Sequence, residues 1–195
     1  AASLIKLYIM GAVYSSYDNI AAANGQEQVD KLLNAMITVS DNDSANTLVG
    51  MLGNGDNAAG QEAVNTYCKN NGYTDTSMGR MLLEKASANE NYTSARDCSV
   101  FLKNIYENKL EHSEDMLNLL KQQTRTEKIP KGIPSGVETA NKTGELDHVE
   151  NDAAIVFDGE NPYIICVMAD NLSDTTEARQ RIVDISSVVY ENISK

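Results

Sequence analysis

The opening segment is the feature that most restricts how this chain can fold, because it predicts a helix that is apolar on nearly every side. Between residues 3 and 13, only Ser3 and Lys6 are neither apolar, aromatic nor glycine. Such a helix belongs in a protein interior, and residues three apart on a helix share a face. We therefore expect a buried helix, extending to about Tyr17, with a hydroxyl and an amine side by side near its start.

The buried lysine needs a physical reason. Burial lowers the pKa of a lysine and makes its neutral amine available as a proton acceptor. Ser3 lies in the first helical turn, where free backbone N–H groups and the helix dipole favour developing negative charge. A serine nucleophile can be activated in this way without a histidine. The alternative is that Ser3 only caps the helix and that the Lys6 side chain extends to solvent, because the short S-x-x-K pattern also occurs by accident.

Composition limits both the class of protein and its partners. The 195 residues, of which 42% are hydrophobic and 23% charged, suit one globular domain over residues 1–195. The formal net charge of -12 argues against binding to nucleic acid or to anionic membrane surfaces. No apolar run approaches the roughly 18 residues of a membrane-spanning helix, and no signal peptide is evident.

The cysteines and histidines give little support to a metal site or a histidine-based triad. The three cysteines lack metal-ligand spacing, and we expect mostly buried thiols and no metal or cofactor; they are Cys68, Cys98 and Cys166. His112 lies among charged residues, which favours a solvated turn. His148 follows a possible strand and could approach a site, although an ordinary polar position is the simpler interpretation. A Ser-His-Asp triad is therefore disfavoured.

Hydrophobic periodicity divides the chain into a helical block, over about residues 18–128, and a sheet with a C-terminal helix, over about residues 136–195. After a turn-rich break at 18–25, we expect a helix at 26–38, a second one that is capped by Asp43 and ends at Gly53, and a third at 58–70. Two more helices should follow, one capped by Thr93 or Ser94 and one capped by Ser113. Residues 73–91 show no clean period and predict a long surface loop with one helical turn at 81–85.

The second part reads as an antiparallel sheet and a helix. Strands are expected at 137–144, 151–157 and 162–168. Thr175 or Thr176 should cap a last helix, whose apolar residues would pack on the sheet: Ile182, Ile185, Val188, Val189 and Ile193. The predicted fold class is α+β, an antiparallel sheet flanked by helices plus an all-helical block.

Three short motifs occur in order along this framework. Ser3-Leu4-Ile5-Lys6 starts a helix, Ser40-Asp41-Asn42 lies between two helices, and Lys142-Thr143-Gly144 ends a strand. Together they resemble the S-x-x-K, S-D-N and K-T-G motifs of class A β-lactamases and penicillin-binding proteins. The segment Ser40–Asn46 also looks like the longer S-D-N-x-x-A-N form of that family, and the likeness covers essentially the whole chain. It implies a β-lactamase/transpeptidase-like fold.

The resemblance also implies an acyl-transfer mechanism. Ser3 would be the nucleophile and Lys6 its base, while Ser40, beside Lys142, would pass a proton to the leaving nitrogen. The implied substrate-binding residues are Asn42, Thr143, Gly144 and Glu145, with Lys142 and Thr143 on a substrate carboxylate. Backbone N–H groups of Ser3 and Glu145 would form the oxyanion hole.

The implied substrate is a β-lactam or a peptidoglycan-type peptide, and the implied location is extracytoplasmic. One alternative is a penicillin-binding enzyme of the D-alanyl-D-alanine carboxypeptidase or transpeptidase kind. Another, from a different class, is a catalytically silent cell-wall binding module, which the three intact motifs disfavour.

Two departures from the family pattern matter. Matching Arg80 to the family's loop arginine puts Leu82 where β-lactamases carry the glutamate that activates water, and Asn91 where the arginine's aspartate partner would be. Because leucine cannot activate water, we expect slow deacylation; the alternative, which the matching disfavours, is that Glu84, two residues on, replaces that glutamate. The family also completes a five-stranded sheet with strands from before the nucleophile, whereas this chain supplies about three; we therefore expect that an upstream segment is missing or cleaved.

Overall fold

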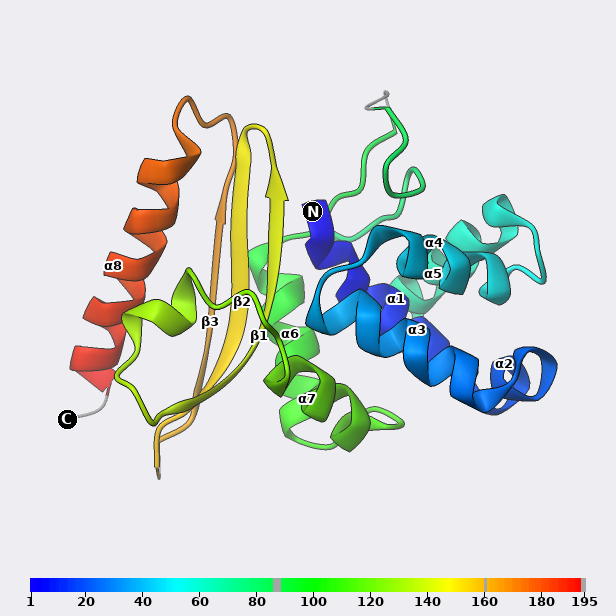
Figure 1. Ribbon diagram of the computed structural model, residues 1–195, viewed down its shortest axis with the longest axis horizontal. Helices are drawn as coiled ribbons and strands as arrows, with labels where there is room; N and C mark the ends of the chain where they lie inside the picture. Colours follow the sequence, from blue (N-terminus) through cyan, green and yellow to red (C-terminus); the bar gives the residue numbers. More distant parts are fainter. Residues whose placement is uncertain (86–88, 160, 194–195) are drawn as a thin grey trace.

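The computed structural model describes residues 1–85, 89–159 and 161–193. Figure 1 shows a helical block on one side and an antiparallel sheet on the other, with the last helix on the outer face of the sheet. The helical block contains η1 (Ala2–Leu4), α1 (Ile5–Tyr14), α2 (Tyr17–Asn24), α3 (Gln26–Thr38), α4 (Asn42–Leu52), α5 (Asn57–Asn70), α6 (Ala95–Tyr106) and α7 (Ser113–Lys121). The remainder comprises η2 (Ile129–Gly132), β1 (Glu138–Leu146), β2 (Val149–Phe157), β3 (Tyr163–Ala169) and α8 (Thr175–Ile193). The predicted α+β fold class is confirmed.

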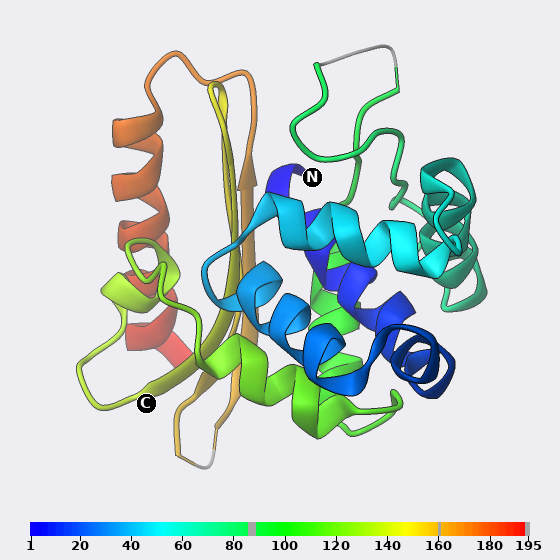
Figure 2. The ribbon, with the colours of Figure 1, turned by 45° about the vertical axis from the view of Figure 1, so that its right-hand side comes forward.

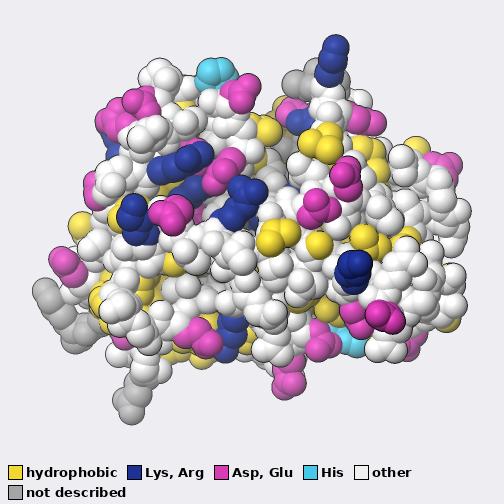
Figure 3. Space-filling model, in the orientation of Figure 1, with side chains coloured by type: hydrophobic (Ala, Val, Ile, Leu, Met, Phe, Trp, Pro, Cys, Tyr) yellow, Lys and Arg dark blue, Asp and Glu magenta, His cyan; other side chains and the backbone are white. Residues whose placement is uncertain are grey.

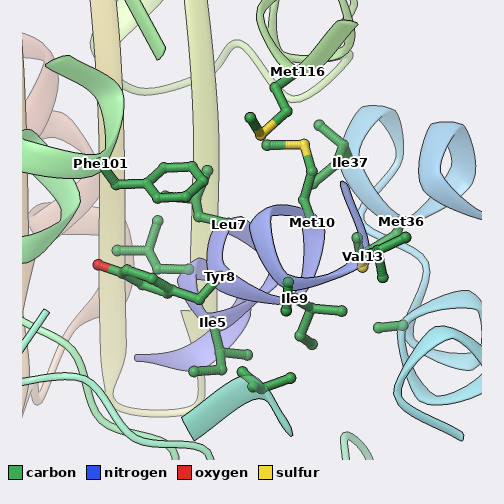
Figure 4. Close-up of a cluster of buried hydrophobic side chains, with 14 of the residues drawn as sticks. Ile5, Leu7, Tyr8, Ile9, Met10, Val13, Met36, Ile37, Phe101 and Met116 are labelled. Carbon is green, nitrogen blue, oxygen red and sulfur yellow. The ribbon is translucent and has the colours of Figure 1, made fainter. Parts of the chain in front are cut away.

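Helix α1 is the centre of the core, as its sequence predicts. All ten of its residues are buried, and the ring of Tyr8 lies 5.3 Å from that of Tyr73 and 5.4 Å from that of Phe101. In Figure 4, side chains from several helices surround α1, with Phe101 near Leu7 and Met116 near Met10. Because the core is built around α1, the two polar side chains at its start are held in a fixed place.

The end of α1 differs from the prediction. This helix ends at Tyr14 rather than at about Tyr17, and the expected break at 18–25 is helix α2. Asp18 in the first turn and three consecutive alanines favour that helix, and Gly25 ends it at a φ of 90°.

Two helix caps also differ from the prediction. The cap of α4 is Asp41, not Asp43, because the Asp41 carboxylate accepts the N–H of Ser44 at 2.7 Å. That of α8 is Asp174, not Thr175 or Thr176, since its carboxylate accepts two backbone N–H groups of the first turn. Aspartate is as good a helix cap as serine or threonine, so the choice between neighbours depends on backbone geometry.

The segment 73–91 is not the surface loop that was expected. Four of its apolar side chains are buried: Tyr73, Met78, Met81 and Leu82. Residues 81–85 form no helical turn, and a bridge between Ser77 and Tyr92 closes the base of the loop. Asn65 on α5 holds Met78 through both its backbone N–H and its carbonyl. Side-chain amides from the helical block therefore supply the order that periodicity did not reveal.

The sheet has the order β1-β2-β3, with Thr143 opposite Asp152 and Glu145 opposite Glu150. All three strands were predicted, with bounds shifted by one or two residues. The prediction for α8 is only partly right: Ile182 is buried, and Val189 is partly buried against the same apolar cluster. The other three predicted contacts are 42–58% exposed: Ile185, Val188 and Ile193. Within the described ranges the sheet is too narrow to cover the whole apolar stripe of α8.

The three thiols are free, as expected. Cys68 and Cys98 are buried, and Cys166 is partly buried. No helix in the described ranges combines the length and the apolar character needed to cross a bilayer.

A buried charge network that the sequence did not reveal joins the sheet to η2 and α8. The side chains of Lys128 and Glu150 are each 1% exposed, and their charged atoms lie 2.6 Å apart. Glu150 also accepts hydrogen bonds from Arg179, while Lys128 donates to the Asn151 carbonyl at 3.0 Å. The network therefore joins β2 to the segment that begins η2 and to helix α8.

Replacing Lys128 by Met is expected to lower the free energy of unfolding by about 3–5 kcal/mol, because it leaves the Glu150 carboxylate buried with one partner fewer. Urea denaturation would measure the change. Lys131→Met is the matched control, since Lys131 is 56% exposed and its pair with Glu127 should contribute under about 1 kcal/mol. Equal stability of the two variants would contradict the prediction.

Candidate active site

The structure brings the first two motifs together around the Lys6 amine. Lys6 Nζ donates to Ser3 Oγ at 3.1 Å, to the Ser40 carbonyl at 2.7 Å and to Asn42 Oδ1 at 2.6 Å. Ser3 lies in the 3₁₀ turn η1, where residues three apart are nearly eclipsed, and Lys6 follows in the first turn of α1. The predicted proximity of hydroxyl and amine is therefore present.

Ser40 joins this group to the third motif. Its Oγ accepts from Lys6 Nζ at 3.2 Å and from Lys142 Nζ at 2.9 Å. Ser40 has a φ of 63°, in the left-handed region that non-glycine residues rarely adopt. That conformation lies directly before the Asp41 cap of α4. A strained residue held by its surroundings is a common feature of functional sites.

Burial disfavours the protonated form of both Lys6 and Lys142. Burial lowers the pKa of Lys6 to about 8; Asp41 opposes this effect and Arg125 adds to it. Burial also lowers the pKa of Lys142 well below its usual value, and the charge of Lys6 contributes. Near neutral pH, Lys6 therefore has an appreciable neutral fraction that can accept a proton.

Strand β1 presses against the start of η1 because Gly144 has no side chain. A Cβ at Gly144 would lie 3.2 Å from the backbone nitrogens of Ser3 and Leu4, and 3.0 Å from the Ala1 carbonyl oxygen. Real Cβ atoms seldom make contacts that tight, so a larger residue would push the strand away from Ser3. Glycine here keeps β1 beside the hydroxyl.

A small pocket of about 180 Å³ contains Ser3. Its lining includes Asn42, Leu82, Glu84 and Glu145. Four other hollows among the described residues are larger, at about 710, 750, 220 and 450 Å³, but Ser3 lines none of them. We therefore take the small pocket as the candidate site because of its chemistry and not its size. Its lining residues come from η1, the start of α4, the end of β1, and residues 80, 82–84 and 90–91. Figures 1 and 2 show the N-terminus near the upper end of the sheet.

Leu82 is held in this pocket by its backbone. The Asn46 side chain accepts from the Leu82 N–H at 2.9 Å and donates to the Leu82 carbonyl at 2.9 Å. The Leu82 side chain is 8% exposed. The carboxylate of Glu84 instead accepts the backbone N–H of Met81 at 3.1 Å, and Glu84 is exposed. Leu82, whose backbone is fixed by Asn46, therefore gives the pocket an apolar side chain at this position.

The partner of Arg80 differs from the alignment-based expectation. The guanidinium of Arg80 forms an ion pair with Glu90, one residue before Asn91. Asn91 Oδ1 accepts the backbone N–H groups of Gly79 and Arg80, at 2.9 and 3.1 Å. The loop thus keeps an arginine–carboxylate pair, with the carboxylate shifted by one position, while Asn91 holds the backbone.

The sequence indicated no role for a buried carboxylate on β2, beside the K-T-G strand. Asp152, opposite Thr143, accepts from Asn141 Nδ2 and from the Ile129 N–H, both at 3.0 Å. Burial raises the pKa of Asp152 to about 6, although its hydrogen bonds and the nearby lysines act in the opposite direction. The signal that was available is the polar run Glu150-Asn151-Asp152 at the start of an otherwise apolar strand.

The histidines lie outside the site. His148 is exposed and hydrogen-bonds to the Leu172 carbonyl at 2.9 Å, and His112 precedes α7 beside Asp115. Among residues 1–85, 89–159 and 161–193, no group of three or more His, Cys, Asp or Glu side chains could hold a metal ion.

Comparison with known proteins agrees with the motifs and the fold. The model of the β-lactamase enzyme family matches residues 19–193. Among solved structures, PBP-A has a TM-score of 0.83 and 24% identity, covering 98% of this chain and 80% of that one. A β-lactamase from Sphaerobacter thermophilus has a TM-score of 0.83 and 23% identity, covering 99% and 82%.

A further match is a leucine-to-glutamate mutant of PBP-A, solved as an acyl-enzyme complex with penicillin G; its TM-score is 0.81 and its identity 22%, covering 98% and 80%. No curated protein sequence matches this chain. Since the family model matches most of the chain, the protein belongs to the β-lactamase enzyme family.

Proposed function

We propose that this protein is a serine hydrolase that forms an acyl-enzyme at Ser3 with a β-lactam or a related amide or ester, and that it deacylates slowly. The observation that carries the proposal is the 3.1 Å contact between Ser3 Oγ and the buried Lys6 Nζ. Neutral Lys6 takes the proton as Ser3 Oγ attacks the carbonyl carbon. The N–H groups of Ser3 and Glu145 stabilise the oxyanion.

Collapse of the tetrahedral intermediate breaks the bond to the leaving nitrogen, which takes a proton from Ser40, and Ser40 takes one in turn from the Lys6 ammonium, 3.2 Å away. Lys142, 2.9 Å from Ser40 Oγ, favours that transfer. Asn42 holds the substrate's amide side chain, and Lys142 and Thr143 hold its carboxylate. In a β-lactam, opening of the ring leaves the whole molecule attached to Ser3 as an ester.

Incubation with penicillin G should therefore add the full mass of the antibiotic to the protein, because ring opening releases no fragment. Intact-mass spectrometry measures the adduct, and peptide mapping should place it at Ser3. Ser3→Ala should abolish it, whereas Ser15→Ala, at the far end of α1, should not. An adduct that survives Ser3→Ala would refute the assignment, and a protein that takes up no acyl donor would favour the silent binding module.

A second candidate is a penicillin-binding enzyme of the D-alanyl-D-alanine carboxypeptidase or transpeptidase kind. The observation that favours it is Leu82, an apolar side chain in the pocket where a water-activating carboxylate would be needed. From the substrate class that the family resemblance implies, we also propose an extracytoplasmic location. Detection of the full-length protein only in the cytosol would contradict that location.

A further inference from the structure

The pocket of Ser3 is lined in part by an acidic residue of the K-T-G strand, Glu145. Glu145 lines this pocket and is two residues beyond Thr143 on β1, so the two side chains share a face of the strand about 7 Å apart. Under the proposed function, Thr143 and Lys142 bind a substrate carboxylate. Such a group would therefore face Glu145.

Cations surround the Glu145 carboxylate. Its oxygens lie 3.1 Å from Lys128 Nζ, 3.4 Å from Arg125 Nη1 and 3.8 Å from Arg179 Nη2. In Figure 3, Lys and Arg side chains gather, with acidic ones among them, over the part of this face that covers the strands and α8. Burial opposes ionisation of Glu145, but these cations outweigh it and lower the pKa of its carboxyl.

The two carboxylates of this group are not equivalent. Glu150 is 1% exposed and is held by Lys128 at 2.6 Å and by Arg179 at 2.7 Å. Glu145 is 31% exposed, and its contacts with the same two cations are longer. Its third partner, Arg125, has an exposure of 49% and contributes to the electrostatic environment of both Lys6 and Lys142. Glu150 is therefore the structural anion, and Glu145 is the one at the pocket wall.

We propose that Glu145 is a specificity-determining residue: an internal carboxylate that neutralises Arg125 and Lys128 beside the K-T-G strand and so disfavours substrates that carry a carboxylate. This inference rests on the proposed function, because that function places the substrate carboxylate at Thr143. Removing the charge of Glu145 frees Arg125 for an external anion and removes a like charge on the same face of the strand as Thr143. Uncharged acyl donors lack this penalty.

The test compares penicillin G with its methyl ester, which differ only in the carboxylate. Binding is measured by calorimetry in the Ser3→Ala protein, so that no acylation intervenes. Adding Glu145→Gln should raise the ratio of acid to ester affinity about tenfold. Adding Arg125→Gln as well should reverse most of that gain. Because a ratio is measured, general effects on pocket shape cancel.

Glu138→Gln is the matched control, since Glu138 lies on the same strand and pairs with Lys121 at its other end. It should leave the ratio unchanged. An unchanged ratio in Glu145→Gln, or no binding of the acid by that variant, overturns the inference. The proposed function is decided separately by adduct formation at Ser3, so the two can fail independently.

Discussion

Replacing Leu82 by glutamate is expected to speed hydrolysis of the Ser3 ester by about 10²–10⁴-fold, the usual contribution of a general base. Leu82 lines the pocket of Ser3, and Asn46 fixes its backbone through two hydrogen bonds of 2.9 Å. A carboxylate added there would be presented to a water molecule beside the ester. Stopped-flow measurements with a chromogenic cephalosporin should show a burst of about one equivalent and a slow phase in the wild type.

The controls for this prediction separate charge from shape. Leu82→Gln has nearly the shape of the glutamate variant without a base, so its slow phase should stay close to that of the wild type. Glu84→Gln should also change little, because the Glu84 carboxylate is used to hold the Met81 N–H. Rapid wild-type turnover without a burst, lost in Glu84→Gln, would instead identify Glu84 as a displaced base.

Local patterns were sufficient to predict most of the fold. Helix α3 has the predicted bounds because its apolar positions repeat with helical spacing, and the three strands were predicted from the change of pattern after Pro134. The apolar character of α1 predicted its burial, and the spacing of three residues predicted the proximity of Ser3 to Lys6. These features depend on neighbours in the sequence.

Features that depend on distant partners were not predictable. The order of the 73–91 loop comes from Asn65 and Asn46, which are ordinary helix residues in the sequence. The exposure of Ile185, Val188 and Ile193 on α8 depends on how much of the sheet lies against this helix. Hydrophobic periodicity in the sequence does not indicate the extent of the sheet. Helix α2 was missed because weakly amphipathic, alanine-rich turns resemble a loop when only periodicity is considered.

The candidate site shows the same division. Its motif residues were named from spacing and resemblance, whereas the shift of the Arg80 partner from Asn91 to Glu90 required the folded loop. Glu145 was expected to contribute its backbone N–H. The contacts of its side chain with Lys128 and Arg125 join segments about 20 residues apart, which a single sequence does not indicate.

Replacing Lys6 by Met should slow acylation by penicillin G about 10²–10⁴-fold, because it removes the proposed proton acceptor while keeping an unbranched side chain of similar length. The pKa of Lys6 is about 8, so the neutral amine becomes the minor form as the pH falls below that value. The wild-type acylation rate should therefore rise about tenfold per pH unit up to about pH 8 and level off above it.

Time-resolved mass spectrometry between pH 6 and 9 gives these rates, and circular dichroism checks that the variants remain folded. Lys103→Met, on the exposed face of α6, should keep the wild-type profile, since that side chain is 61% exposed. A flat wild-type profile, or a folded Lys6→Met protein that acylates at the wild-type rate, would exclude Lys6 as the base. Ser40, whose Oγ accepts hydrogen bonds from both Lys6 and Lys142, would then be the next residue to test as the proton acceptor.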